Sequence, residues 1–263
     1  MTEYALALLV ALTGWWFSTG LVLWLVHRSE KHHRSIFAVA TVLMLCSFVL
    51  VARVAEQLSP AAAVMAFCLA LLLWGWLEMS YLMGFVTGPH NEACPEDVGV
   101  LGRLGRGLGT SLWHELVLLA MVSLLYAISI DQPNQITLWA FSVLWLMRWS
   151  AKLNLVLGVR NYNREWLPMH LAYLDSYIPR RPFNMLFPLS LALGSALTYV
   201  LLHTSYMATD LSVVVGLTLV GMLAALGTLE HLFLMLPLGD SALWHWAAPM
   251  AEKDSVSADF KGS

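Results

Sequence analysis

The sequence predicts an all-α, polytopic membrane protein, on the evidence of its composition, the length of its apolar stretches and its charge distribution. The chain has 263 residues, of which 59% are hydrophobic and 12% are charged, and its mean hydropathy is +0.69. About a quarter of the residues of a typical soluble domain are charged. A water-soluble domain with the composition of this chain could not cover its apolar surface. A membrane span needs about 20 largely apolar residues. Seven stretches are interpreted as spans: 5–26, 36–52, 61–86, 111–130, 136–157, 184–203 and 211–236.

The basic residues fall on alternate connections between these spans. Lys and Arg are retained in cytoplasmic loops, so their distribution orients a membrane protein. The tail and the connections after the first, third and fifth spans carry eleven of the 14 basic residues: Arg28, Lys31, Arg34, Arg103, Arg106, Arg160, Arg164, Arg180, Arg181, Lys253 and Lys261. The other set of connections carries Arg53. This asymmetry predicts an outside N-terminus and a cytoplasmic C-terminus.

The chain is expected to form a single transmembrane helical domain over 1–246, with a disordered cytoplasmic tail over 247–263. Within the third connection, GVLGRLGRGLG lacks both a preceding strand and the Gly-Lys-Ser/Thr ending of a phosphate loop. It is interpreted as a flexible, basic entry to the fourth span. In the cytoplasmic loop 158–183, the spacing of apolar residues over 161–177 predicts an amphipathic helix at the membrane interface.

Polar side chains within the spans are expected at one depth near the cytoplasmic face. Ionisable residues are costly in a bilayer and usually face the bundle interior, so each one is a candidate for a site. Most lie roughly 6 to 13 Å from the cytoplasmic helix ends, at 1.5 Å per residue. They are Glu78, His114, Glu115, Arg148, Lys152, Asn154, Glu230 and His231. Glu165 and His170 of the adjoining loop are expected to fold back onto this polar layer.

Three interpretations of the polar layer remain open. An ion-pair network is favoured, because three carboxylates nearly balance Arg148 and Lys152 where low dielectric demands neutralisation. A metal such as iron would suit carboxylate and imidazole ligands. However, the Glu-x-x-His spacing of di-iron bundles is absent, and adjacent His and Glu residues project about 100° apart on a helix. The third interpretation is contact with a tetrapyrrole or a lipid headgroup.

Three long motifs distinguish the chain: LGVRNYNREWLPMHLAYLDSYI, RRPFNMLFPLS and EHLFLMLPLGDSALWHW. With these motifs it resembles the PuhE-type photosynthetic complex assembly proteins of anoxygenic phototrophic bacteria over nearly its whole length. The resemblance implies a multi-pass protein of the bacterial inner (intracytoplasmic) membrane. It implies a role in assembling the reaction centre and its light-harvesting antenna, or in modulating bacteriochlorophyll supply to them. Its partners would be membrane lipid, reaction-centre or antenna subunits and the pigment, and no catalytic residue is implied.

This context makes His114, His203 and His231 candidates for ligating the magnesium of a chlorophyll, although a hydrogen-bonding role is the ordinary one for a lone histidine. The sequence shows no nucleophilic triad and no nucleic-acid-binding module. The function predicted is therefore a non-catalytic assembly factor, with bacteriochlorophyll or iron as the cofactors to consider. The alternative is a membrane-embedded, metal-dependent oxidoreductase that uses the same His and carboxylate residues on a pigment or lipid-like substrate. A transporter would also explain charged residues in spans, but repeated halves are not evident.

Overall fold

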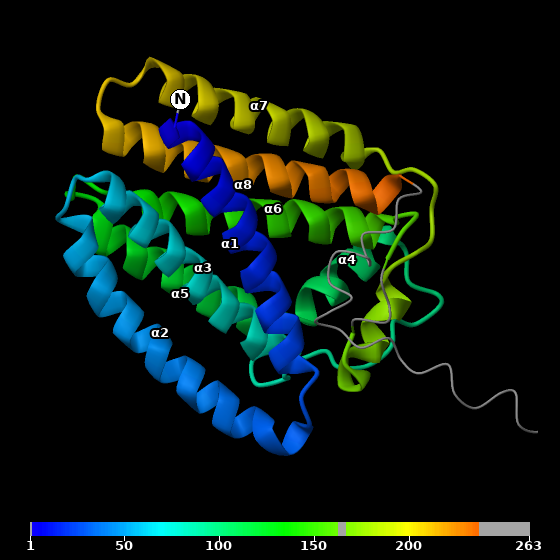
Figure 1. The fold of residues 1–263 in the computed structure, drawn as a ribbon. Coiled ribbons are helices and arrows are strands. Elements are labelled where there is room, and N and C mark those ends of the chain that lie inside the picture. Colours follow the sequence, from blue (N-terminus) through cyan, green and yellow to red (C-terminus); the bar gives the residue numbers. More distant parts are fainter. Residues whose placement is uncertain (1, 163–166, 237–263) are drawn as a thin grey trace, which may run out of the picture.

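A computed structural model describes residues 2–162 and 167–236, and this part of the chain is helical apart from its connections (Figure 1). The tail expected over 247–263 lies outside the described residues. The elements are α1 (Thr2–Val26), η1 (Glu30–His32), α2 (His33–Ala55), α3 (Pro60–Leu82), α4 (Val100–Gly109), α5 (Leu112–Ser129), α6 (Ile136–Leu157), η3 (Met169–Tyr177), α7 (Leu186–Met207) and α8 (Leu211–Met235).

The long helices correspond to the seven predicted stretches. Among the described helices, six are long and apolar enough to cross a membrane: α1, α2, α3, α5, α7 and α8. α6 has 22 residues, which is also sufficient length, but Arg148 and Lys152 lower its hydropathy. The prediction of a polytopic helical membrane protein is confirmed.

Helices α3 and α8 form the centre of the bundle. Of their most apolar windows, 61% and 67% are buried, against 17% for α2 and 11% for α7. α3 packs against α1, α2 and α6, and α8 packs against α1, α6 and α7, as the ribbon in Figure 1 shows. The side chains of Phe67, Phe141 and Leu219 are fully buried in the core that these helices share.

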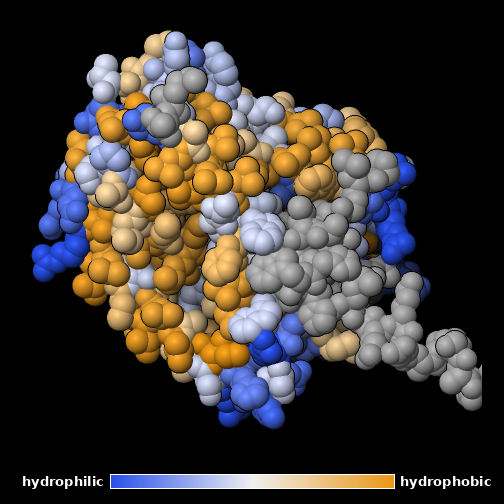
Figure 2. Space-filling view, in the orientation of Figure 1, coloured by the Kyte–Doolittle hydropathy of each residue, from blue (hydrophilic) through white to orange (hydrophobic). Residues whose placement is uncertain are grey.

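The peripheral helices α2 and α7 expose large apolar side chains. These include Val39, Val42, Leu45 and Val49 on α2, and Leu189, Leu193, Tyr199 and Val200 on α7. Figure 2 shows apolar residues over the flank of the bundle and hydrophilic residues towards its ends. An apolar flank of this extent is unusual on a monomeric soluble protein, but it is the ordinary surface of helices in lipid.

Both ends of the bundle are defined by the antiparallel helices. We call the basic end the one where α1, α3, α6 and α8 finish and where α2, α5 and α7 begin. Its connections carry the described basic residues Arg28, Lys31, Arg103, Arg106 and Arg180, among others. The short connections after α2, α5 and α7 lie at the opposite end.

The glycine-rich segment before α5 corrects one expectation. Val100–Gly109 is a helix, α4, and not a flexible entry. Gly107 and Gly109 are buried on its inner side, and a Cβ at Gly109 would overlap the His90 ring. A Cβ at Gly107 would lie 3.4 Å from Val156 Cγ2 on α6. These glycines therefore serve close packing of α4 against the bundle.

The loop between α6 and α7 also differs from its prediction. Within the expected helix over 161–177, the described residues Met169–Tyr177 form the 3-10 helix η3, and residues 163–166 lie outside the described residues. Leu171 and Tyr177 are buried, and the Tyr177 hydroxyl donates to the Glu92 carbonyl at 3.1 Å. Burial raises the pKa of this hydroxyl. The segment is thus tied to the connection between α3 and α4, over the basic end.

Three asparagines bond helix ends, and two of them, Asn134 and Asn184, each join two helices. Asn134 Nδ2 donates to the Val54 carbonyl at the end of α2, and its Oδ1 accepts from the Ile136 amide at the start of α6. Asn184 Oδ1 accepts from the first amides of α7, while its Nδ2 donates to the Gly158 carbonyl after α6 at 2.8 Å. Asn161 Nδ2 donates to the Phe233 carbonyl in the last turn of α8. Helix ends leave such groups unpaired, so these side chains satisfy them in place of water.

Candidate functional site

Helix α6 carries two polar faces at the basic end. Arg148 and Lys152 are four residues apart and lie on one face. Ser150 and Asn154 are also four residues apart, and they are turned about 200° from Arg148 and Lys152. Because α6 lies between α3 and α5 on one side and α7 and α8 on the other, its polar residues contact two different sets of helices.

The first face pairs Arg148 with Glu78 of α3. Arg148 Nη1 donates to Glu78 Oε1, and the two side chains are 21% and 19% exposed. The guanidinium also lies over the Tyr81 ring, 5.6 Å from its centroid. Two opposite charges in this position largely cancel, which lowers the cost of placing either one within the membrane.

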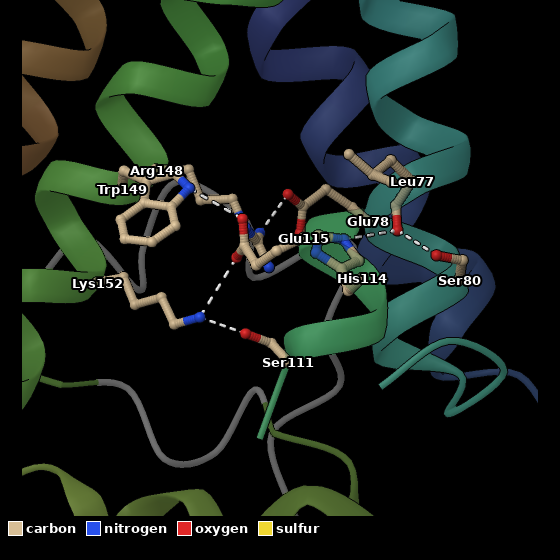
Figure 3. A network of polar contacts seen from close by, with 9 residues as sticks. All are labelled: Leu77, Glu78, Ser80, Ser111, His114, Glu115, Arg148, Trp149 and Lys152. Carbon is tan, nitrogen blue, oxygen red and sulfur yellow. Dashed lines mark hydrogen bonds and ion pairs between the residues drawn. The ribbon is translucent and has the colours of Figure 1, made fainter. Parts of the chain in front are cut away.

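A second pair lies one turn further along α6. Lys152 Nζ donates to Glu115 Oε1 of α5 at 3.3 Å and to the Ser111 hydroxyl. The other carboxylate oxygen, Glu115 Oε2, accepts from Trp149 Nε1 at 2.9 Å. Figure 3 shows both carboxylates between α6 and the facing helices α3 and α5. The favoured interpretation, an ion-pair network, matches these half-buried pairs in this part of the layer.

His114 points away from its neighbour Glu115. Its Nε2 donates to the Leu77 carbonyl of α3 at 3.3 Å, and its ring meets Tyr81 edge to face at 5.2 Å. The side chain is fully buried, and Nδ1 has no hydrogen-bond partner among the described residues. His114 and Glu115 therefore contact different residues, because neighbouring side chains project about 100° apart on a helix.

The second face of α6 forms a separate seam with α7 and α8. His231 Nδ1 donates to the Gly227 carbonyl at 2.7 Å, so Nε2 accepts from the Ser150 hydroxyl at 2.9 Å. Asn154 Nδ2 donates to the Ser190 hydroxyl of α7 at 2.9 Å. Both ring nitrogens of His231 are thereby occupied. The polar residues predicted as one layer divide into an ion-pair cluster and this hydrogen-bonded seam.

The remaining predicted residues lie outside both groups. Glu230 is exposed and contributes to the wall of a cavity described below. His170 is exposed, and its ring lies over Gly84, where a Cβ would be 3.1 Å from Nε2. It does not reach the ion-pair cluster as expected, because η3 places it beside the end of α3. Glu165 falls outside the described residues. His203, the third pigment-ligand candidate, is exposed on α7 and stacks on Tyr199.

A cavity of about 450 Å³ lies beside the ion-pair cluster. Its walls come from α1, α3, α6 and α8, and Leu174, Tyr177 and Ile178 of the loop before α7 line it at the basic end. Glu78, Arg148 and Lys152 face it from one side. This volume is within the range of sites for small molecules and cofactors.

The metal interpretation finds little support in the geometry. Over residues 2–162 and 167–236, no group of three or more His, Cys, Asp or Glu side chains could hold a metal ion. His231 is engaged through both nitrogens, and the carboxylates of Glu78 and Glu115 are engaged by cations. The described donors therefore do not form the ligand set that the oxidoreductase alternative requires.

Several residues of the site were not anticipated. Ser111, Trp149 and Ser150 complete the hydrogen bonds of the cluster and the seam. Serine and tryptophan are common in spans, so their type alone carried no signal. Their position in the sequence was informative, because each lies within one helical turn of a charged or amide residue that the sequence predicts for the polar layer.

The profile of a family described as "Protein of unknown function (DUF3623)" matches residues 1–255. The chain belongs to this family. It is also 37% identical, over 252 residues, to the "Uncharacterized 30.4 kDa protein in puhA 5'region" of Rhodobacter capsulatus. That similarity covers 93% of this chain and 92% of the relative. No solved structure matches this member of the family.

Proposed function

We propose that the protein is an integral membrane assembly factor for the bacterial photosynthetic reaction centre and its light-harvesting antenna. The observation that carries this proposal is the similarity to the Rhodobacter capsulatus protein, whose name places it in the puhA 5′ region. The motifs in 157–190 and 230–246, which resemble the PuhE-type assembly proteins, agree with that context.

The structure supports a holding role within the membrane. Arg148 and Lys152 within the bundle are paired with Glu78 and Glu115, and His114 is hydrogen-bonded to backbone, as in a rigid scaffold. Its peripheral helices α2 and α7 present apolar flanks that other membrane helices could pack against. The enzyme alternative lacks a comparable observation in the described residues.

The test is complementation in Rhodobacter capsulatus. A strain lacking the relative would receive either this chain, tagged for detection, or the empty vector. We expect the near-infrared absorption of reaction centre and antenna, per membrane protein, to be lower with the empty vector and restored by this chain. Transcripts of the reaction-centre and antenna polypeptides should be equal in the two strains, which separates assembly from expression.

Two results would overturn the proposal. The first is an unchanged complex level in the strain lacking the relative. The second is failure of this chain to restore the level although the tagged protein is present in the membrane. In the Arg106→Met variant, which alters an exposed residue of α4, restoration should remain complete.

A further inference from the structure

The cavity at the basic end has the form of a site for an elongated ligand. It is lined along α6 from Leu144 to Val156, a length of roughly 18 Å at 1.5 Å per residue. Helix α1 faces α6 across it, and α3 and α8, which pack against both, close its sides. Such a space between helices of a bundle is a usual place for a bound small molecule.

The cavity walls change in character along this length. Near the middle of the bundle they are apolar and aromatic, with Trp15, Leu71, Trp74 and Leu144. Further along, Arg148 and Lys152 lie beside the hydroxyls of Thr110 and Ser111 and form a polar zone, and Leu174 and Ile178 line the cavity beyond it at the basic end. A molecule that fits both parts has an apolar tail in the membrane interior and a polar head beside α6.

The charges around the polar part indicate a neutral head. Arg148 and Lys152 face the cavity together with the carboxylates of Glu78 and Glu230, so cationic and anionic side chains balance there. Arg148 donates to Glu78 through Nη1, and the other terminal nitrogen, Nη2, makes no hydrogen bond among the described residues. A carbonyl oxygen of a ligand in the cavity would accept from this guanidinium donor. A carboxylate head would gain no net attraction, because the two carboxylates offset the two cations.

We infer that this cavity binds a neutral, elongated lipid-like molecule whose carbonyl oxygen accepts a hydrogen bond from Arg148. Lipid-soluble quinones belong to this chemical class. None of the described lining residues is a histidine, so the walls offer no imidazole to a metal-bearing ring. The inference goes beyond the assembly role and does not depend on it.

Tryptophan fluorescence provides the test, because Trp15 and Trp74 line the cavity. The full chain in phosphatidylcholine nanodiscs would be titrated with decylubiquinone, a neutral quencher that carries two ring carbonyls and an apolar tail. We expect a saturable quenching phase above the linear quenching caused by partitioning into lipid. Palmitate, with a similar tail and an anionic head, should not displace the quinone.

Two variants locate the site. Ala151→Leu adds volume to the cavity wall, and Arg148→Lys keeps a cation opposite Glu78 but removes the second terminal donor of the guanidinium. Each should weaken the saturable phase about tenfold or more, which is the effect of losing one good contact. Ala196→Leu, the same change on the exposed side of α7, should leave it unaltered. If Arg148→Lys fails to fold, Ala151→Leu alone tests whether the quinone binds in the cavity.

Three outcomes would overturn the inference: purely linear quenching, equal binding by wild type and Ala151→Leu, or displacement by palmitate at the quinone's own concentration. None of them bears on the level of photosynthetic complexes in the complementation experiment. Failure of either proposal can therefore be recognised separately.

Discussion

Arg148 and Lys152 are the residues whose position in a membrane helix most needs a physical explanation. Each pairs with a carboxylate from a different helix, Glu78 on α3 or Glu115 on α5. A buried pair contributes little net stability, because desolvation opposes the attraction between the charges. Removing one partner is costly, since it leaves a buried charge without compensation. The pairs therefore specify which helices lie next to α6 more than they stabilise the fold.

This argument predicts the effect of Arg148→Met. The variant leaves Glu78 unpaired, so its free energy of unfolding should fall by about 3–5 kcal/mol. The double variant Glu78→Gln/Arg148→Met should recover most of that loss, because neither charge then remains. Unfolding by sodium dodecyl sulfate titration in mixed micelles measures both.

Arg106→Met is the matched control for this prediction. Arg106 is exposed on α4, so its replacement should change the free energy of unfolding by no more than about 0.5 kcal/mol. A double variant as unstable as Arg148→Met would contradict the ion-pair explanation and would point to the lost contact of the Arg148 guanidinium with the Tyr81 ring.

At the scale of the element, the helix ends are held by side chains that act on two helices at once. Asn184 is buried and bonds the end of α6 and the start of α7. Gly158, with φ +110°, follows α6 and gives the chain the left-handed turn that ends it. At the other end of the bundle, Asp210 caps α8, and hydrogen bonds from Ser212 and the Val213 amide hold the pKa of that carboxyl below its ordinary value.

Asn184→Ala should separate the two helix ends. The change removes the oxygen that accepts from the first amides of α7 and the NH2 group that donates to carbonyls at the end of α6. Because these groups are buried, we expect the free energy of unfolding to fall by about 1–3 kcal/mol. Asn91→Ala, in an exposed position between α3 and α4, should change stability by no more than about 0.5 kcal/mol. Equal effects of the two variants in the detergent titration would refute the capping role.

Close packing of α8 against α6 provides a second prediction for the elements. A Cβ at Gly227 would lie 2.7 Å from Met147 Cγ, so Gly227→Ala forces the helices apart or displaces Met147. We expect a loss of about 1–3 kcal/mol from this overpacking.

The matching change in an open place should act in the opposite direction. Gly105 is exposed in α4, and a Cβ there would meet nothing within 4 Å. Gly105→Ala should therefore stabilise the helix by up to about 1 kcal/mol, because alanine is the better helix former. The same detergent titration compares the two variants, and a neutral Gly227→Ala would show that Met147 yields without cost.

At the scale of the whole molecule, the basic end predicts the orientation. Basic residues of the described chain gather in the connections there, so this end should face the cytoplasm. In a background with Cys46, Cys68 and Cys94 replaced by serine, Gln57→Cys should react in intact cells with a membrane-impermeant maleimide. Asn91→Cys should react only after the membrane is permeabilised, and the reverse pattern would overturn the orientation.

The fold class followed from the sequence because it depends on sums over many residues. Seven apolar stretches of sufficient length predict long helices whatever their partners, and the structure forms each of them within a few residues of the predicted bounds. Local rules were less reliable for the connections. GVLGRLGRGLG, expected as a flexible entry to the fourth span, forms a helix, because close contact of Gly107 and Gly109 with their neighbours outweighs the low helix propensity of glycine.

Depth along the helices was also readable from the sequence, and it grouped Glu78, Glu115, Arg148 and Lys152, which form two ion pairs in the structure. What the sequence could not decide was which helix each face of α6 meets, because that depends on the packing of separate segments. Tertiary structure alone divided the expected layer into an ion-pair cluster and a His231–Ser150 seam, with Glu230 at the cavity wall. The cavity itself has no sequence signal, since it is the space that α1, α3, α6 and α8 leave between them when their larger side chains meet elsewhere.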